Sequence, residues 1–325
     1  MTGSGVSVAL CTYNGEAFLR AQLDSIARQD LPPDEIIICD DQSTDRTAAV
    51  VDAFASSTSV RVRWVVNGDR LGVTRNFEKA IGLCSGAIIA LSDQDDVWKA
   101  RKLSTIAAAF LECPDSGYVF SDATLTDDEL SPIGSLWKSV RFSGSRMRGY
   151  SDGRQLDVLL QGAPFVYGNT LAFRASLRNV ILPIHTGSRY FTHDTWIALL
   201  LSAYDAPGVL IDKPLVDYRQ HRNQQAGGHV SWTPHAQMQR AFVDKQSYFL
   251  DYAQLLDDIL RRLPAGCGDA SATIKACISH LEARRSIRDT VGLARLRAVQ
   301  RELYNGGYAR FGSSWRSAIR DVLVG

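Results

Sequence analysis

Short apolar runs alternate with helix-length segments over the first 115 residues, and this alternation limits the possible folds more than any other feature. The expected strands are Val6–Leu10, Glu35–Cys39, Val60–Val66 and Gly86–Ser92. The segments between them carry apolar residues at helical spacing and predict helices over residues 16–29, 45–54, 74–83 and 101–111. Strands and helices alternating in this way predict an α/β domain, with a Rossmann-like, mostly parallel sheet flanked by helices on both faces.

The remaining chain changes character twice. Between about residues 116 and 230 the pattern loosens into short strands and turns around one apolar helix, Asp194–Tyr204. After residue 230 the segments are long and helical. The 325 residues therefore predict one large domain over residues 1–230, with halves of about 1–115 and 116–230, and a helical C-terminal extension over residues 231–325.

Composition excludes several classes of protein. The 36 Lys and Arg residues against 35 Asp and Glu residues give a net charge of +1, so a nucleic-acid partner is not expected. The six cysteines form no CxxC pair, which argues against a zinc site and suits a reducing compartment. The longest strongly apolar run, Trp196–Tyr204, is about half of what a membrane helix needs. The N-terminus has no basic segment before its apolar run, so a cytoplasmic protein is expected.

Polar clusters follow three of the predicted strands. They are Thr12–Asn14, Asp40–Ser43 and Asp93–Asp96. Ligands of an open parallel sheet bind beyond the carboxyl ends of its strands, so these clusters are expected to meet. Capping of the following helices is the alternative for single residues such as Ser43. It does not explain three clusters rich in acids.

The segment Asp93-Gln94-Asp95-Asp96 carries three carboxylates in four residues. Their repulsion requires a positive partner, and carboxylate oxygens suit Mg²⁺ or Mn²⁺ bridging to a diphosphate. Asp93 and Asp95 are the expected ligands, and a solvated acidic loop is the alternative. No glycine-rich dinucleotide turn follows the first strand and no GxxxxGK occurs, so the phosphates are expected to be bound through the metal.

Two features of the second half add candidate groups. His193-Asp194 precedes the apolar helix, where Asp194 is either functional or a helix N-cap. His221 lies between Arg219 and Arg222, and is either a structural histidine or a nitrogen ligand of the metal, with one of the arginines facing phosphate.

Five segments together resemble the inverting family 2 glycosyltransferases of the GT-A fold. They are VSVALCTYNGEAFLRAQLDSIARQ, EIIICDDQSTDRT, ALSDQDDVWKARKL, the His-Asp pair at 193–194 and YRQHRNQ. The resemblance covers about residues 5–225 and implies a GT-A catalytic domain. The DQDDVW, HDTW and YRQH segments are most similar to bacterial rhamnosyltransferase-type members that build O-antigen or exopolysaccharide.

The resemblance also implies roles for individual residues. Asp95 matches the main metal ligand, His221 the histidine that completes the coordination, and Asp194 the general base. Asp93 matches a position that contacts ribose or metal. Many members have Glu where this chain has His193, so the chain departs from the pattern there. The expected donor-binding residues are Thr12, Tyr13, Asn14, Asp41, Ser43, Asp93 and Arg219.

The activity implied is an inverting, Mn²⁺- or Mg²⁺-dependent glycosyl transfer. The donor is a dTDP- or UDP-sugar, with dTDP-rhamnose as the first guess, and the acceptor is a saccharide or a lipid-linked saccharide. One alternative is a sugar-1-phosphate nucleotidyltransferase, which would carry a glycine-rich loop with Arg and Lys where this chain has CTYNGEAF. The other is a non-catalytic binding module, which would be expected to have lost the acids or His221.

The C-terminal extension is rich in arginine. Residues 281–320 contain nine arginines and three acids, interleaved with leucine, isoleucine and valine from Leu281 to Leu303. A basic amphipathic helix is typical of peripheral contact with anionic lipid, and it predicts a location at the inner face of the cell membrane. The alternative is a helix packed on the catalytic domain.

Overall fold

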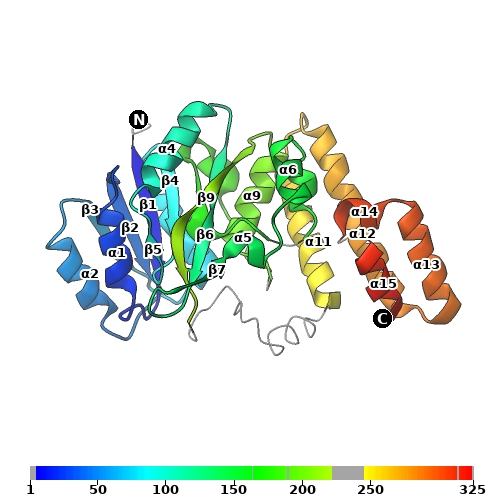
Figure 1. The fold of residues 1–325 in the computed structure, drawn as a ribbon, viewed down its shortest axis with the longest axis horizontal. Coiled ribbons are helices and arrows are strands. Elements are labelled where there is room, and N and C mark those ends of the chain that lie inside the picture. The colour runs from blue at the N-terminus through cyan, green and yellow to red at the C-terminus, as the bar shows by residue number, and fades with distance from the viewer. Residues whose placement is uncertain (1–4, 163, 189, 222–244, 313–314, 324–325) are drawn as a thin grey trace.

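The structure, a computed structural model, describes residues 5–162, 164–188, 190–221, 245–312 and 315–323. Figure 1 shows an α/β body that continues into helices at its C-terminal side. The N-terminal helices and the last C-terminal helices lie at opposite ends of the long axis of the molecule.

The first half contains the predicted alternation of strands and helices. Its elements are β1 (Val6–Thr12), α1 (Leu19–Ala27), β2 (Glu35–Asp40), α2 (Thr47–Ala55), β3 (Arg61–Val66), α3 (Val73–Leu83), β4 (Ile88–Ser92), β5 (Val97–Trp98) and α4 (Lys102–Glu112). All residues of β1 and β2 are buried, as expected for central strands covered on both faces.

The second half is built from shorter elements. They are β6 (Tyr118–Thr126), β7 (Pro132–Ser135), α5 (Leu136–Ser139), α6 (Ser145–Ser151), α7 (Gln155–Leu159), the 3₁₀ turn η1 (Gly168–Thr170), β8 (Leu171–Arg174), the 3₁₀ turn η2 (Ala175–Leu177), α8 (Arg178–Ile181), α9 (His193–Ala203) and β9 (Gly208–Arg219). The apolar helix predicted at Asp194–Tyr204 is α9, shifted by one residue.

Among the described residues one nine-stranded sheet runs through both halves, in the order β3-β2-β1-β4-β8-β6-β9-β5, with β7 beside β6. Strands β3, β2, β1 and β4 are parallel. Strand β8 is antiparallel to both of its neighbours, β4 and β6. The prediction of a mostly parallel sheet is therefore correct for the first half, whereas the complete sheet is mixed.

The end of β1 and the start of α1 differ from the predicted bounds for local reasons. The parallel pairing continues through Cys11–Cys39 and Thr12–Asp40, so the strand extends to Thr12. Helix α1 begins at Leu19 because the amides of Phe18 and Leu19 both donate to the carbonyl of Gly15 and close a turn. Thr12 and Asp40 consequently lie at the same edge of the sheet.

Strand β9 brings the far end of the domain back to the acidic segment. Its residues Val216 and Asp217 pair with Trp98 and Val97 of β5, directly after Asp93–Asp96. A pairing between segments about 120 residues apart places His221, which follows β9, beside the acids that follow β4.

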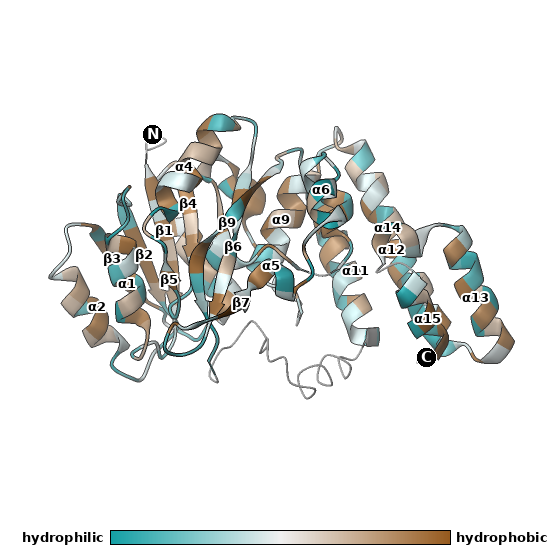
Figure 2. Ribbon diagram, in the orientation of Figure 1, coloured by the Kyte–Doolittle hydropathy of each residue, from teal (hydrophilic) through white to brown (hydrophobic). Residues whose placement is uncertain are grey.

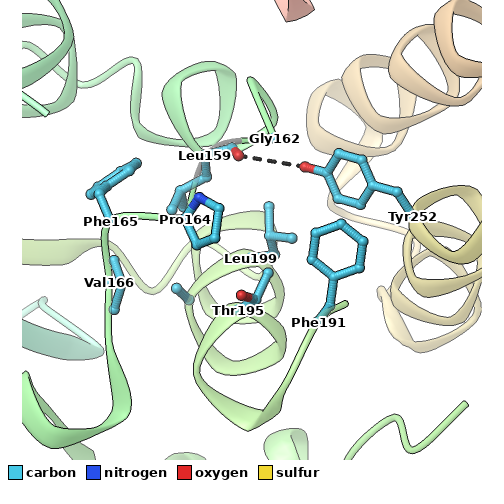
Figure 3. A pocket seen from close by; sticks show the side chains of 10 residues that line it. Leu159, Gly162, Pro164, Phe165, Val166, Phe191, Thr195, Leu199 and Tyr252 are labelled. Atoms are coloured by element: carbon cyan, nitrogen blue, oxygen red, sulfur yellow. Dashed lines mark hydrogen bonds between the residues drawn. The ribbon is translucent and has the colours of Figure 1, made fainter. Parts of the chain in front are cut away.

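The first C-terminal helices share the core of the α/β body. The elements are α11 (Lys245–Arg262), α12 (Gly268–Asp289), α13 (Gly292–Tyr304), α14 (Gly307–Phe311) and α15 (Trp315–Leu323). Leu256 and Ile259 of α11 are fully buried in the same apolar cluster as Leu199 and Leu200 of α9. Figure 3 shows the contact region, where the Tyr252 hydroxyl of α11 donates to the Leu159 carbonyl. A cavity of about 20 Å³, enough for one water, remains between Leu159, Leu199 and Tyr252.

Several arginines and apolar residues of the extension point inward, against the predicted surface role. Leu281, Ile287 and Val299 are buried. Arg284 and Arg288 both pair with the fully buried Asp321, at 2.6 and 3.4 Å. The amphipathic face expected from Leu281 to Leu303 is thus partly a packing face, because α14 and α15 cover it.

Replacing Asp321 should destabilise the C-terminal helices. Asp321→Ala leaves two nearly buried guanidinium groups without a carboxylate, a change that typically costs about 3–5 kcal/mol. Burial raises the pKa of Asp321, but the Arg284 and Tyr308 hydrogen bonds outweigh it and hold the pKa below its usual range. This contribution is therefore present above about pH 4 and is lost as the pH falls further.

Hydrogen exchange of the α12 and α15 amides measures the effect. Asp212→Ala, which removes an exposed carboxylate on β9, is the control. Equal exchange rates in the two variants would show that Asp321 contributes nothing.

Candidate active site

The acidic segment Asp93–Asp96 lies between β4 and β5, and its last two carboxylates have different surroundings. Asp95 Oδ2 is 2.8 Å from His221 Nε2. Asp96 is fully buried and accepts hydrogen bonds from the Asn169 amide at 2.7 Å and the Arg219 backbone amide at 3.1 Å. Asp96 therefore holds neighbouring segments together, while Asp95 forms a pair with the predicted histidine ligand.

Asp93 lies within electrostatic range of the other candidate acids. Burial, followed by the charges of Asp95 and Asp194, raises the pKa of Asp93 to about 7. Asp95 belongs to the same segment as Asp93, whereas Asp194 comes from the first turn of α9. The fold thus brings Asp95 and Asp194 within electrostatic range of Asp93, while the roles expected for these acids stay predictions.

Lys102 is a buried cation beside these acids, which sequence reasoning missed. Its ammonium donates to the Asn169 carbonyl at 2.5 Å and lies 3.6 Å from the centre of the Trp98 ring. Burial lowers the pKa of Lys102 to about 7, while Asp96 and Asp93 act to raise it. Lys102 in turn lowers the pKa of Asp93, so it offsets part of the carboxylate repulsion.

The Arg219 side chain contacts the acidic segment from β9. Its Nε donates to the Asp95 carbonyl at 2.9 Å, Nη1 donates to the Asp128 carbonyl, and the guanidinium lies over the Phe18 ring. These contacts fix the backbone that carries Asp95. The phosphate contact predicted for Arg219 stays a prediction, and Arg222, the alternative, lies outside the described residues.

Asp194 lies in the first turn of α9, and Thr192 occupies the N-cap position. Its Oδ1 accepts from the Thr192 hydroxyl and the Thr195 amide, both at 2.7 Å, and Oδ2 accepts from the Gly168 amide at 3.1 Å. Asp194 is not the N-cap residue of α9, and it bonds one helical amide, that of Thr195. Helix capping, the alternative role, therefore explains only part of its contacts. Three short contacts fix the orientation of the carboxylate and leave lone pairs on its oxygens for another donor.

His193 has a packing role. Its ring is stacked on Phe77 with a centroid distance of 3.9 Å, and neither ring nitrogen has a hydrogen-bond partner among the described residues. Burial lowers the pKa of His193, although Asp194 acts to raise it. The ring lies so close to Gly168 that an added Cβ there would be 2.6 Å from Nε2.

The 3₁₀ turn η1 connects Asp194 with the acidic segment Asp93–Asp96. Gly168 donates its amide to Asp194, and the next residue, Asn169, contacts both Asp96 and Lys102. One turn of three residues therefore fixes the position of the general-base candidate relative to the acidic segment.

Four of the predicted donor-binding residues, Thr12, Tyr13, Asn14 and Ser43, take part in hydrogen bonds between the three polar clusters. The Asn14 amide donates to Ser43 Oγ at 2.8 Å, and the Asn14 side chain accepts from the Thr44 amide. Thr12 Oγ1 and the Tyr13 amide both donate to the side-chain oxygen of Gln94, at 2.6 and 2.9 Å. The clusters after β1, β2 and β4 are thus in direct contact.

Asp41 is buried and bonded to the loop after β3. Its oxygens accept from Asn67 Nδ2 and from the amides of Leu71 and Gly72, at 2.6–2.9 Å. This arrangement orients the loop toward the edge of β1 and β2. The base-binding role of Asp41 stays a prediction.

Gln94, Lys102 and Asn169 are the site residues that sequence reasoning did not single out. Gln94 and Lys102 lie within the quoted segment ALSDQDDVWKARKL, yet a glutamine or lysine there is expected to be solvated. Their proximity to a crowded acidic motif is the one signal that pointed to them. Asn169 lies in a segment without a recognisable pattern.

The donor atoms fit a divalent cation that also binds a substrate. Among the described residues no three His, Cys, Asp or Glu side chains are close enough to form a metal site by themselves. The Asp95–His221 pair offers one oxygen and one nitrogen. Mg²⁺ and related ions commonly bind one or two carboxylates and take their other ligands from phosphate and water. The site therefore fits a metal bound to a diphosphate better than an all-protein cage.

None of the helices that the structure describes combines the length and the apolar character required to cross a lipid bilayer.

Known proteins share this sequence pattern and fold. The sequence profile of the family described as Glycosyl transferase family 2 matches residues 7–179, more than half of the chain. EpsE of Bacillus subtilis (strain 168), named as a glycosyltransferase, is 30% identical over 176 residues, which cover 54% of this chain and 58% of EpsE. The chain thus spans less than two thirds of that relative. RfbG of Shigella flexneri, named as a dTDP-rhamnosyl transferase, is 23% identical over 231 residues, 69% of this chain and 75% of RfbG.

Among solved structures, the mannosyltransferase PcManGT of Pyrobaculum calidifontis, in complex with GDP-Man and Mn²⁺, superposes with a TM-score of 0.52. The match covers 99% of this chain and 86% of PcManGT at 18% identity, so it bears on the fold alone. The predicted GT-A fold with C-terminal helices is confirmed. With the family profile covering most of the α/β body, this chain belongs to family 2 of the glycosyltransferases.

Proposed function

We propose that this chain transfers a sugar from a nucleoside diphosphate donor to an acceptor hydroxyl, with inversion and with a divalent cation. The observation that carries the proposal is that adjacent residues of η1 bond Asp194, through the Gly168 amide, and the acidic segment, through Asn169, while Asp95 of that segment pairs with His221. A single displacement requires a base for the acceptor hydroxyl and a cation for the departing diphosphate, and the Asp95–His221 pair offers ligands for that cation. A nucleotidyltransferase has no use for the base, and a binding module needs neither.

The residues have separate tasks in this proposal. Asp194, oriented by Gly168, Thr192 and Thr195, takes the proton of the acceptor hydroxyl on a carboxylate oxygen. Asp95 and His221 would hold Mn²⁺ or Mg²⁺, with Asp93 beside them. When bound, the cation supplies a Lewis acid for the departing diphosphate. No protein nucleophile is involved, so the anomeric centre inverts.

The donor and the acceptor are proposed at a finer level. RfbG, which is named as a dTDP-rhamnosyl transferase, matches 69% of the chain, and this supports dTDP-rhamnose as the first donor to test. The carboxylate of Asp41 and the Tyr13 ring, on which the Arg70 guanidinium stacks, lie at the edge proposed to hold the base. A saccharide or lipid-linked saccharide of bacterial surface polysaccharide is the proposed acceptor, from the resemblance of the motifs. The predicted membrane contact and cytoplasmic location stay predictions.

Asp194→Asn should abolish transfer but preserve donor binding. A positioned general base typically contributes about 10²–10⁴-fold, so kcat is expected to fall in that range while the Kd for the donor is unchanged. The amide keeps the shape of the carboxylate and one accepting oxygen. Transfer of radiolabelled sugar and calorimetric titration of dTDP-rhamnose and UDP-sugars measure the two quantities.

Asp205→Asn is the matched control, because Asp205 is exposed two residues after α9 and has φ 60°, which Asn tolerates. An Asp194→Asn enzyme as fast as this control would exclude Asp194 as the base.

Asp95→Asn should weaken the binding of Mn²⁺ by at least tenfold, because a neutral amide replaces the charged ligand. Calorimetric titration of Mn²⁺ in the presence of the nucleoside diphosphate measures the affinity. Asp115→Asn, at an exposed position, is the control. Mn²⁺ binding of equal strength in both variants would contradict a metal at the Asp95–His221 pair.

Binding of Mn²⁺ should also weaken as the pH falls through about 7, because protons compete for Asp93, whose pKa is raised to about 7 by burial and by Asp95 and Asp194. Lys102→Met removes the ammonium that lowers this pKa, so the midpoint of the loss should move to higher pH. Mn²⁺ titrations at a series of pH values measure the midpoint.

Lys99→Met is the control, since Lys99 pairs with Asp217 on the surface. A midpoint that stays the same in Lys102→Met as in Lys99→Met would exclude coupling between Lys102 and Asp93.

A further inference from the structure

Helices α13 and α15 lie at the C-terminal end of the molecule (Figure 1), and Figure 2 shows hydrophobic and hydrophilic residues mixed along them. Large apolar side chains of both helices are exposed. Leu293 is 73% exposed and Tyr304 93% on α13, and Trp315 is 60% exposed and Leu323 74% on α15. A single exposed leucine is ordinary on a protein surface. An aromatic or a leucine at each of several positions on two neighbouring helices indicates an interaction surface.

The exposed residues of α15 follow one face of the helix. Trp315, Ile319 and Leu323 are spaced at i, i+4 and i+8, so they lie in one row. The opposite face is buried, with Ala318 and Asp321 packed on the bundle. The row is therefore not part of the core of the protein, and it faces away from it.

Helix α13 has the same division. Val299 and Glu302 are buried, whereas Leu293, Leu296 and Tyr304 are exposed. The inward face packs against the neighbouring C-terminal helices. The outward residues have no packing role among the residues that the structure describes.

The charge exposed on these helices has one sign. Residues 290–323 contain two acids, Glu302 and Asp321. Glu302 is paired with the buried His280 at 2.5 Å, and Asp321 with Arg284 and Arg288. Both carboxylates thus lie inside the packed C-terminal helices, each against a buried partner, and neither is presented on the outward surface.

The exposed arginines Arg297, Arg301, Arg316 and Arg320 are left with no carboxylate within ion-pair distance among the described residues. On α15 two of them are adjacent to the apolar row, since each follows Trp315 or Ile319 by one position. A surface of arginines with tryptophan, tyrosine and leucine, and with no exposed acid, matches the chemistry of a bilayer that carries anionic headgroups.

We propose that the outward faces of α13 and α15 form a docking surface for anionic lipid. The arginines attract the headgroups, and the Trp315–Leu323 row inserts at the boundary between headgroups and acyl chains. The proposal does not depend on the proposed sugar-transfer activity. It narrows the membrane contact from the predicted arginine-rich segment, residues 281–320, to the outward faces of α13 and α15, because Leu281, Ile287 and Val299 are buried.

Sedimentation of the full-length chain with vesicles tests the proposal. We expect binding to vesicles of phosphatidylcholine with phosphatidylglycerol at low salt, and little binding to phosphatidylcholine alone. Arg316→Gln with Arg320→Gln should weaken binding roughly 30-fold, because each basic residue near an anionic surface contributes about a factor of five. Trp315→Ser with Ile319→Ser should weaken the binding that persists at high salt, where charge attraction is screened.

The control variant is Arg63→Gln with Leu111→Ser, which removes one exposed arginine on β3 and one exposed leucine on α4. All replaced side chains are exposed, so each variant should fold, and circular dichroism verifies it. Equal vesicle binding by the control and by the α15 variants would overturn the proposal.

Size-exclusion chromatography with light scattering tests whether a second copy of this chain, and not lipid, occupies the surface. If the wild-type chain self-associates through Trp315 and Ile319 and does not bind the vesicles, the surface is an interface between copies and the lipid proposal is wrong. A monomer that binds the anionic vesicles in a Trp315-dependent manner supports it.

Discussion

Repulsion among four carboxylates is the constraint on which the site depends. Asp93 lies within electrostatic range of Asp95, Asp96 and Asp194, and Asp95 also acts on Asp96. Burial adds to the cost of charging Asp93 and Asp96. Like charges this close together are stable only when cations or hydrogen-bond donors are placed against them. The surrounding fold supplies these from three separate segments: the Lys102 ammonium from α4, the Asn169 amide from η1, and Arg219 from β9.

The compensating groups explain features of the fold that are otherwise unrelated. Strand β9 is twelve residues long, which lets it pair with β6 and β5 and still deliver Arg219 beneath the acidic segment. Turn η1 precedes the short antiparallel strand β8, whose position next to β4 places Asn169 against Asp96. The mixed second half of the sheet is thus the means by which distant donors reach the carboxylates.

Local patterns predicted the first half well because strand and helix periodicities depend on neighbouring residues. The meeting of the clusters after β1, β2 and β4 followed from a general property of parallel sheets. No local sequence pattern indicates that β5 pairs with β9. The burial of Lys102 and the contacts of Arg219 depend on that pairing, so they could not be predicted from the sequence. In the extension, the spacing of apolar residues predicted an amphipathic helix at Leu281–Leu303, but it could not tell that α14 and α15 cover its inward side.

The shared core of α9 and α11 has a consequence for handling the protein in pieces. A chain cut near residue 230 would lose Leu256 and Ile259 from the apolar cluster that also contains α9, and would lose Tyr252, which lines a small cavity together with Leu199. Helix α9 carries Asp194 in its first turn, so such a fragment would loosen the helix on which the proposed chemistry relies. The shortest fragment suited to crystallisation or directed evolution therefore retains α11 and α12, however modular the sequence looks at that point.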